Sequence, residues 1–109
     1  MIIESNKIKS ASDIDNHTRL FFESIEKGDC AAVVAFLGDG IDLSVRNNIG
    51  WTALMVATTF GKTEIVRLLL KKGAEVNAQS FSGLTALKMA TYAKNEEIMQ
   101  LLKQAGAKD

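Results

Sequence analysis

Residues 50–82 read GWTALMVATTFGKTEIVRLLLKKGAEVNAQSFS, and residues 83–109 read GLTALKMATYAKNEEIMQLLKQAGAKD. The second stretch repeats the first at an offset of 33 residues and without a gap. Identical residues stand at twelve of the 27 aligned positions, with glycines and leucines in phase. A fixed period of this length is typical of stacked repeat architectures, so it decides the fold.

A fainter copy of the same unit precedes these two stretches. Gly28, Val33 and Gly40 each recur unchanged 33 positions later, and apolar character persists where identity is lost. Phe21 and Phe36 stand where the middle unit has core leucines, and packing explains them. We therefore divide the chain into a polar leader (residues 1–16) and three repeats (residues 17–49, 50–82 and 83–109).

Each unit has the layout of two short antiparallel helices and an extended return loop. In the middle unit, Thr52 is placed to cap the first helix with its hydroxyl, and Gly61 stands where the chain turns back. Asp29 and Asn95 take the cap position of the second helix in the outer units, where the middle unit has Lys62, a poor cap. Lys94 replaces the turn glycine of the last unit.

That replacement predicts a local backbone cost, because a side chain is disfavoured in a left-handed turn.

The two ends of the array are expected to be polar. Lys103 occupies the position of Leu70, with Gln100 and Gln104 around it, and Glu23 replaces Val56 at the other end. Such capping ends favour a complete small array over a fragment of a longer one. The leader could add a lid on the first repeat through its isoleucines, which are Ile2, Ile3, Ile8 and Ile14.

The repeated unit resembles the ankyrin repeat, whose consensus is similar to G-x-T-P-L-H-x-A-A-x-x-G-H-x-E-I-V-x-L-L-L-x-x-G-A-D-V-N-A. The resemblance covers residues 17–109 and is strongest from residue 50 onward. The residues of the middle repeat that match are Gly50, Thr52, Leu54, Ala57, Gly61, Glu64, Ile65, Val66, Leu69, Leu70, Gly73, Ala74, Val76, Asn77 and Ala78.

The T-P-L-H stretch departs from this pattern, because it reads TALM from Thr52 and TALK from Thr85. The proline that starts the first helix and the histidine that ties neighbouring loops are therefore both absent. The resemblance implies an all-α solenoid of stacked helix-turn-helix units with extended loop tips. It also implies a protein-recognition scaffold that binds partners on the concave face formed by the tips and first helices, without catalysis.

Composition excludes several other functions. The 109 residues carry thirteen basic and thirteen acidic side chains, so the clustered positive charge of a nucleic-acid binder is not expected. No apolar run is long enough for a membrane span, and the polar amino terminus does not resemble a secretion signal. One cysteine and one histidine leave no zinc cluster. We expect a cytoplasmic protein with neither metal nor cofactor.

Large apolar residues at variable positions of the repeat mark the candidate binding surface. Exposed apolar patches commonly mark interaction sites, and aromatic residues often dominate binding energy. Phe60 and Tyr92 have a second interpretation as packing between neighbouring repeats. We predict that a concave strip carries the partner-binding residues, which are Ile49, Trp51, Phe60, Phe81, Leu84 and Tyr92.

The sequence thus predicts a monomer that binds another protein and acts by occupancy, as a scaffold or an inhibitor. One alternative is a structural protein that homodimerises through the same strip, and another is a microbial protein delivered into a host cell. A remote alternative is an enzyme that uses Cys30, for which His17 is the one histidine available as a base. The simpler interpretation of Cys30 is a small residue at the start of a helix.

Overall fold

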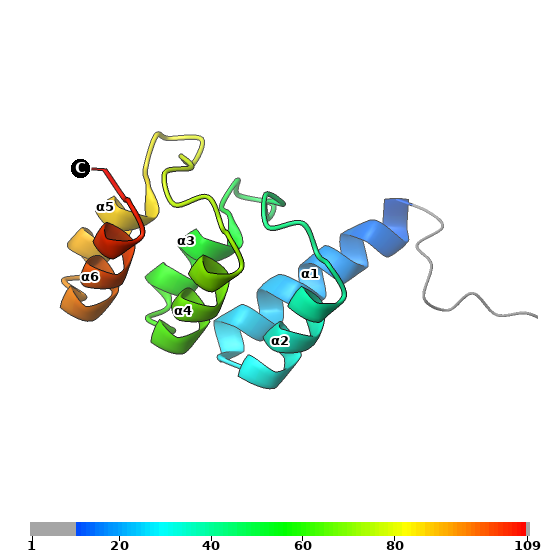
Figure 1. Ribbon diagram of the computed structural model, residues 1–109. Coiled ribbons are helices and arrows are strands. Elements are labelled where there is room, and N and C mark those ends of the chain that lie inside the picture. Colours follow the sequence, from blue (N-terminus) through cyan, green and yellow to red (C-terminus); the bar gives the residue numbers. More distant parts are fainter. Residues whose placement is uncertain (1–10, 109) are drawn as a thin grey trace, which may run out of the picture.

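The protein forms three antiparallel helix pairs stacked side by side in the computed structural model, which describes residues 11–108 (Figure 1). Helices α1, α3 and α5 form one layer and α2, α4 and α6 form the other. The loops that follow α2 and α4 both project on the same side of the stack. The helices are α1 (Ala11–Lys27), α2 (Cys30–Gly38), α3 (Ala53–Thr59), α4 (Thr63–Lys71), α5 (Ala86–Tyr92) and α6 (Glu96–Gln104). This arrangement confirms the predicted all-α stack.

Helix α1 is longer than its counterparts, with 17 residues against seven in α3 and seven in α5. It begins at Ala11, so the helix includes residues 11–16, which the sequence assigned to the leader. The predicted lid falls on residues 1–10 and on the side chain of Ile14, which lie outside the described part of the chain.

Polar side chains cap the helices as the repeat alignment predicted. Thr52 Oγ1 accepts a hydrogen bond from Met55 N at 3.3 Å, which satisfies an amide at the start of α3. Asp29 and Asn95 accept bonds at the starts of α2 and α6, each at 3.1 Å. Lys62 provides no side-chain cap for α4.

The turn between the two helices of a pair needs a left-handed residue. Gly61 adopts a φ of +70° there, and Lys94 takes the equivalent turn with a φ of +57°. The hydrogen bonds match as well, because Gly61 N bonds Thr58 O at 3.1 Å and Lys94 N bonds Thr91 O at 3.0 Å. Lys94 therefore holds a side chain in the left-handed region, the conformation from which the cost was predicted.

One hydrophobic core runs through all three pairs. Phe21, Leu54 and Leu87 occupy equivalent positions on α1, α3 and α5 and are buried in the same cluster. The Phe36 ring is partly buried and lies 5.4 Å from the Phe21 ring, as expected for a core residue. Gln100, Lys103 and Gln104 are exposed at the far end of the stack.

Polar contacts outside the core connect neighbouring repeats. Arg46 Nη1 donates to Gly50 O at 2.7 Å and to Gln79 O, 33 residues further along, at 2.8 Å. Asn77 Nδ2 donates to Gly106 O at 3.2 Å, while Lys108 N donates to Asn77 Oδ1 at 2.9 Å. These contacts join loops that the consensus histidine would otherwise tie together.

Replacing Lys94 with glycine should stabilise the protein by about 1 kcal/mol, because glycine tolerates the left-handed turn without steric cost. Urea unfolding followed by circular dichroism measures the change. Gln100→Gly, in the exposed interior of α6, is the matched control and should lower stability by about 1 kcal/mol. Equal destabilisation by both substitutions would contradict the claim that the Lys94 side chain carries a steric cost in the left-handed turn.

Replacing Thr58 with valine should stabilise the protein by roughly 1 kcal/mol. Thr58 is fully buried, and its hydroxyl has no hydrogen-bond partner among the described residues, so valine removes an unsatisfied polar group. The equivalent Thr91 hydroxyl donates to Leu87 O at 2.8 Å, so Thr91→Val should give no gain. Thermal unfolding of the two variants compares them directly.

Candidate partner-binding surface

The first loop tip (residues 47–51) is closed by an asparagine. Asn47 Oδ1 accepts hydrogen bonds from Ile49 N at 3.1 Å and from Trp51 N at 2.9 Å. Asn47 N also donates to Trp51 O at 2.9 Å. A short polar side chain thus satisfies backbone groups of the tip, as asparagine commonly does in turns.

The second loop tip (residues 80–84) has the same shape with a serine in the asparagine's place. Ser80 N donates to Leu84 O at 2.8 Å, and Leu84 N donates to Ser80 Oγ at 3.1 Å. Ser80 is buried, whereas Phe81, the next residue, is the most exposed of the large apolar residues that the structure describes. The serine therefore fixes the backbone from which Phe81 projects.

The two tips contact each other through the Phe81 ring and Gly50. A Cβ atom added at Gly50 would lie 2.5 Å from Cε2 of Phe81, so the ring rests directly on the glycine backbone. Gly50 has a φ of +83°, which also disfavours a side chain there. With the Arg46 hydrogen bond to Gln79 O, this contact holds the tips together.

The candidate residues differ in exposure. The exposed fractions of Phe81 and Tyr92 are 82% and 71%, and those of Ile49 and Phe60 are 54% and 49%. Trp51 and Leu84 are half-buried, and Trp51 packs against the core. Four of the six predicted residues therefore present large apolar surface, while Trp51 also supports the tip.

These residues fall into two groups on the molecule. Ile49, Trp51, Phe81 and Leu84 belong to the tips, which precede α3 and α5, whereas Phe60 and Tyr92 lie at the opposite ends of those helices. A helix of this length spans roughly 10 Å, so the two groups are separated by the length of α3 and α5. A partner that contacts both groups must also cross α3 and α5.

A groove of about 820 Å³ between α1 and the loop after α2 was missed by the sequence analysis. Charged residues of α1 line one side, and polar residues of the first tip line the other. The charged residues of α1 at helical spacing were the available signal, but the alignment of this repeat is weak. The groove is lined by Thr18, Arg19, Phe22, Glu23, Glu26, Val45, Arg46, Asn47 and Asn48.

Charges near the tips are engaged in local contacts. Arg19 Nη1 pairs with Glu23 Oε2 at 2.6 Å on α1. The Asp42 carboxylate accepts hydrogen bonds from Ser44 N at 2.8 Å and from Ser44 Oγ at 2.7 Å. These bonds lower the pKa of Asp42 below its usual value of 3.8. The carboxylate is charged at neutral pH, and the lowered pKa keeps it charged further into the acid range.

The geometry does not bring the one cysteine and the one histidine together. Cys30 is exposed at the first turn of α2. The His17 ring packs edge-on to Phe36, with 5.0 Å between ring centroids, near the other end of α2. Phe36 lies six residues after Cys30 on the helix, a rise of about 9 Å, so His17 is not placed as a base for the thiol.

Comparisons with known proteins point to one family. A family profile described as "Ankyrin repeats (3 copies)" matches residues 21–109. The chain is 33% identical over 69 residues to "Ankyrin repeat, SAM and basic leucine zipper domain-containing protein 1" from Otolemur garnettii. It is 32% identical over 69 residues to the mouse (Mus musculus) protein of that name. Each match covers 63% of this chain but 14% of the relative.

No helix among the described residues has the length and apolar character needed to cross a membrane.

Removing the Arg46 side chain should weaken the link between the two tips, which then depends on the contact between Phe81 and Gly50. Arg46→Ala is expected to lower stability by about 1 kcal/mol, because two backbone carbonyls lose a charged donor. It should also speed amide hydrogen exchange at both tips. Arg19→Ala, which removes an exposed pair within α1, is the matched control and should change stability by less than about 0.5 kcal/mol. Unaltered exchange at residues 80–84 in Arg46→Ala would show that the Arg46 hydrogen bond to Gln79 does not hold the second tip in place.

Proposed function

Because the chain belongs to the ankyrin-repeat family, we propose that it binds a partner protein through the apolar side chains of its loop tips and of the ends of α3 and α5. Ankyrin repeats are generally protein-interaction modules. Binding of this kind acts by occupancy, so the protein serves as a scaffold or an inhibitor. The observation that carries the proposal is the 82% exposed Phe81 ring, held in place on a tip.

Physical chemistry supports Phe81 as the centre of the interface. Burying a side chain of this size contributes about 2 kcal/mol, equivalent to roughly thirtyfold in affinity. The ring already rests on Gly50, so little conformational freedom remains to be lost on binding. Ile49 on the neighbouring tip extends the apolar surface. Together these residues supply a compact anchor that partner side chains can surround.

The groove beside the first tip complements this anchor. Interfaces usually combine an apolar centre with a polar rim. Glu23 and Glu26 of α1 and Asn48 of the loop line the groove. We propose that a partner seated on the tips reaches this groove with polar or basic side chains. Tyr92 and Phe60 form the opposite border of the contact area.

A cytoplasmic setting and a monomeric state complete the proposal. Cys30 is an exposed free thiol, and the sequence contains no second cysteine to pair with it. A reducing compartment suits such a residue.

Phe81→Ala should weaken partner binding by about tenfold or more while leaving the helical content unchanged. Tyr92→Ala tests the second group in the same way. The partner is first recovered by cross-linking and pull-down, and its affinity is then measured by titration. Trp51 is the one tryptophan in the chain and lies in the first tip, so its fluorescence reports binding there.

Val34→Ala is the matched control, because Val34 is 51% exposed but lies on α2, away from the tips. Its affinity for the partner should equal that of the unaltered protein. Unchanged affinity in both Phe81→Ala and Tyr92→Ala would refute the proposed surface. Sedimentation over a concentration series distinguishes the homodimer alternative, which requires a mass that rises with concentration.

A further inference from the structure

The two junctions between neighbouring repeats, here called the first seam (repeats one and two) and the second seam (repeats two and three), differ in their hydrogen bonds. At the seam between the second and third repeats, the carboxamide of Asn77 bonds Gly106 O and Lys108 N. Ser44 stands 33 residues before Asn77, at the first seam. Its hydroxyl donates to Asp42 Oδ1 at 2.7 Å instead of reaching the next repeat. The first seam therefore lacks the carboxamide bridge.

The backbone groups that such a bridge would bond are nevertheless present at the first seam. Gly73 and Glu75 are the equivalents of Gly106 and Lys108. Gly73 has a φ of +91° and Gly106 one of +99°, and both amides bond the carbonyl three residues earlier at 3.0 Å. The two backbones thus have the same conformation. Among the described residues, no hydrogen bond reaches Gly73 O or Glu75 N.

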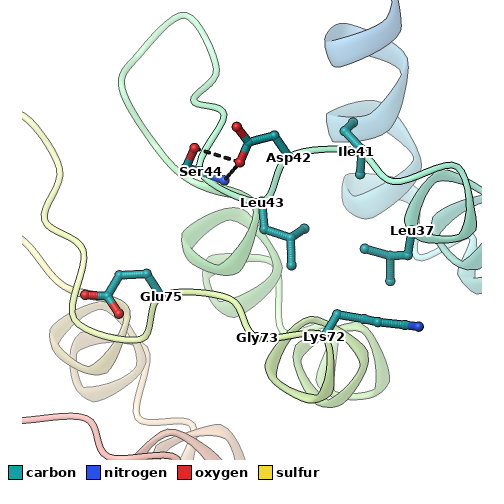
Figure 2. A pocket seen from close by; sticks show the side chains of 8 residues that line it. All are labelled: Leu37, Ile41, Asp42, Leu43, Ser44, Lys72, Gly73 and Glu75. Atoms are coloured by element: carbon teal, nitrogen blue, oxygen red, sulfur yellow. Dashed lines mark hydrogen bonds between the residues drawn. The ribbon is translucent and has the colours of Figure 1, made fainter.

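A pocket of about 390 Å³ lies at this place (Figure 2). Gly73 lines it with backbone atoms, since glycine has no side chain. Leu37 and Leu43 point toward one another across the space, while the carboxylate of Glu75 points away from them. The pocket therefore combines an apolar wall with a solvent-exposed backbone carbonyl and amide that form no hydrogen bond within the described residues.

We propose that this pocket binds a primary carboxamide carried next to a branched aliphatic group, as in an asparagine beside a leucine in a partner peptide. The carboxamide nitrogen donates to Gly73 O, and its oxygen accepts from Glu75 N, in the arrangement that Asn77 shows at the next seam. The aliphatic group packs between Leu37 and Leu43. Gly73 and Glu75 are exposed, so these two hydrogen bonds replace bonds to water.

This site is separate from the proposed tip surface, because none of its lining residues belongs to that surface. It does not depend on the proposed function, and either proposal can fail alone.

Isovaleramide is a suitable probe, because it joins a primary carboxamide to a branched four-carbon tail. In an NMR titration of the full chain, it should shift the amide signals of Gly73 and Glu75 more than those of the loop tips. The matched ketone 4-methyl-2-pentanone keeps the tail and the carbonyl but cannot donate to Gly73 O. It should bind about fivefold more weakly, as expected for one lost hydrogen bond.

Ser44→Asn tests the site from within the chain. The new carboxamide should occupy the pocket, abolish the isovaleramide shifts and raise the melting temperature by roughly 4 °C. Ser82→Asn makes the same change at the exposed second tip and should preserve the shifts. Shifts that persist in Ser44→Asn, or equal binding of amide and ketone by the unaltered chain, would overturn the proposal. The comparison of amide and ketone decides the matter even if Ser44→Asn does not fold.

Discussion

Apolar contact between successive helix pairs is the constraint on which this structure depends. Helices of seven and nine residues are too short to be stable alone, and one pair cannot bury its own apolar face. Leu54 is buried because Phe21 and Leu87 occupy the equivalent positions on either side of it. The 33-residue period therefore has to be kept wherever pairs meet. Positions outside this helix-to-helix contact are free to vary, and the exposed rings occupy such positions.

Stacking fixes the helices but leaves the loops to be fixed by polar contacts. The consensus histidine is absent, and Met55, at its position in the middle repeat, accepts a weak bond from Thr52 N at 3.4 Å. The link between neighbouring tips comes instead from Arg46 and from the Phe81 ring on Gly50. The loop after α2 is therefore bonded to the next loop through Arg46. At Ser44 it makes no such bond, because the Ser44 hydroxyl bonds Asp42 of the same loop.

The sequence predicted the features that are set by residues close together in the repeat. It missed features that depend on contacts between distant residues. Helix pairs, caps and the left-handed turn at Lys94 follow from the repeat alignment, because each is set by a few residues close in the chain. The start of α1 at Ala11 was missed, since polar residues can continue a helix beyond the repeated unit. The half-burial of Trp51 and the reach of Arg46 to Gln79 depend on long-range packing that alignment does not encode.

The two proposed sites differ in the kind of chemistry that forms them. The tip surface consists of side chains, so substitutions can change its specificity without disturbing the fold. The seam pocket presents backbone groups whose positions are set by the end of α4, so its preference for a carboxamide is built into the repeat itself. In a stacked array, each repeat is stabilised by contacts with its immediate neighbours only. A ligand in the seam therefore strengthens the junction between the first and second repeats.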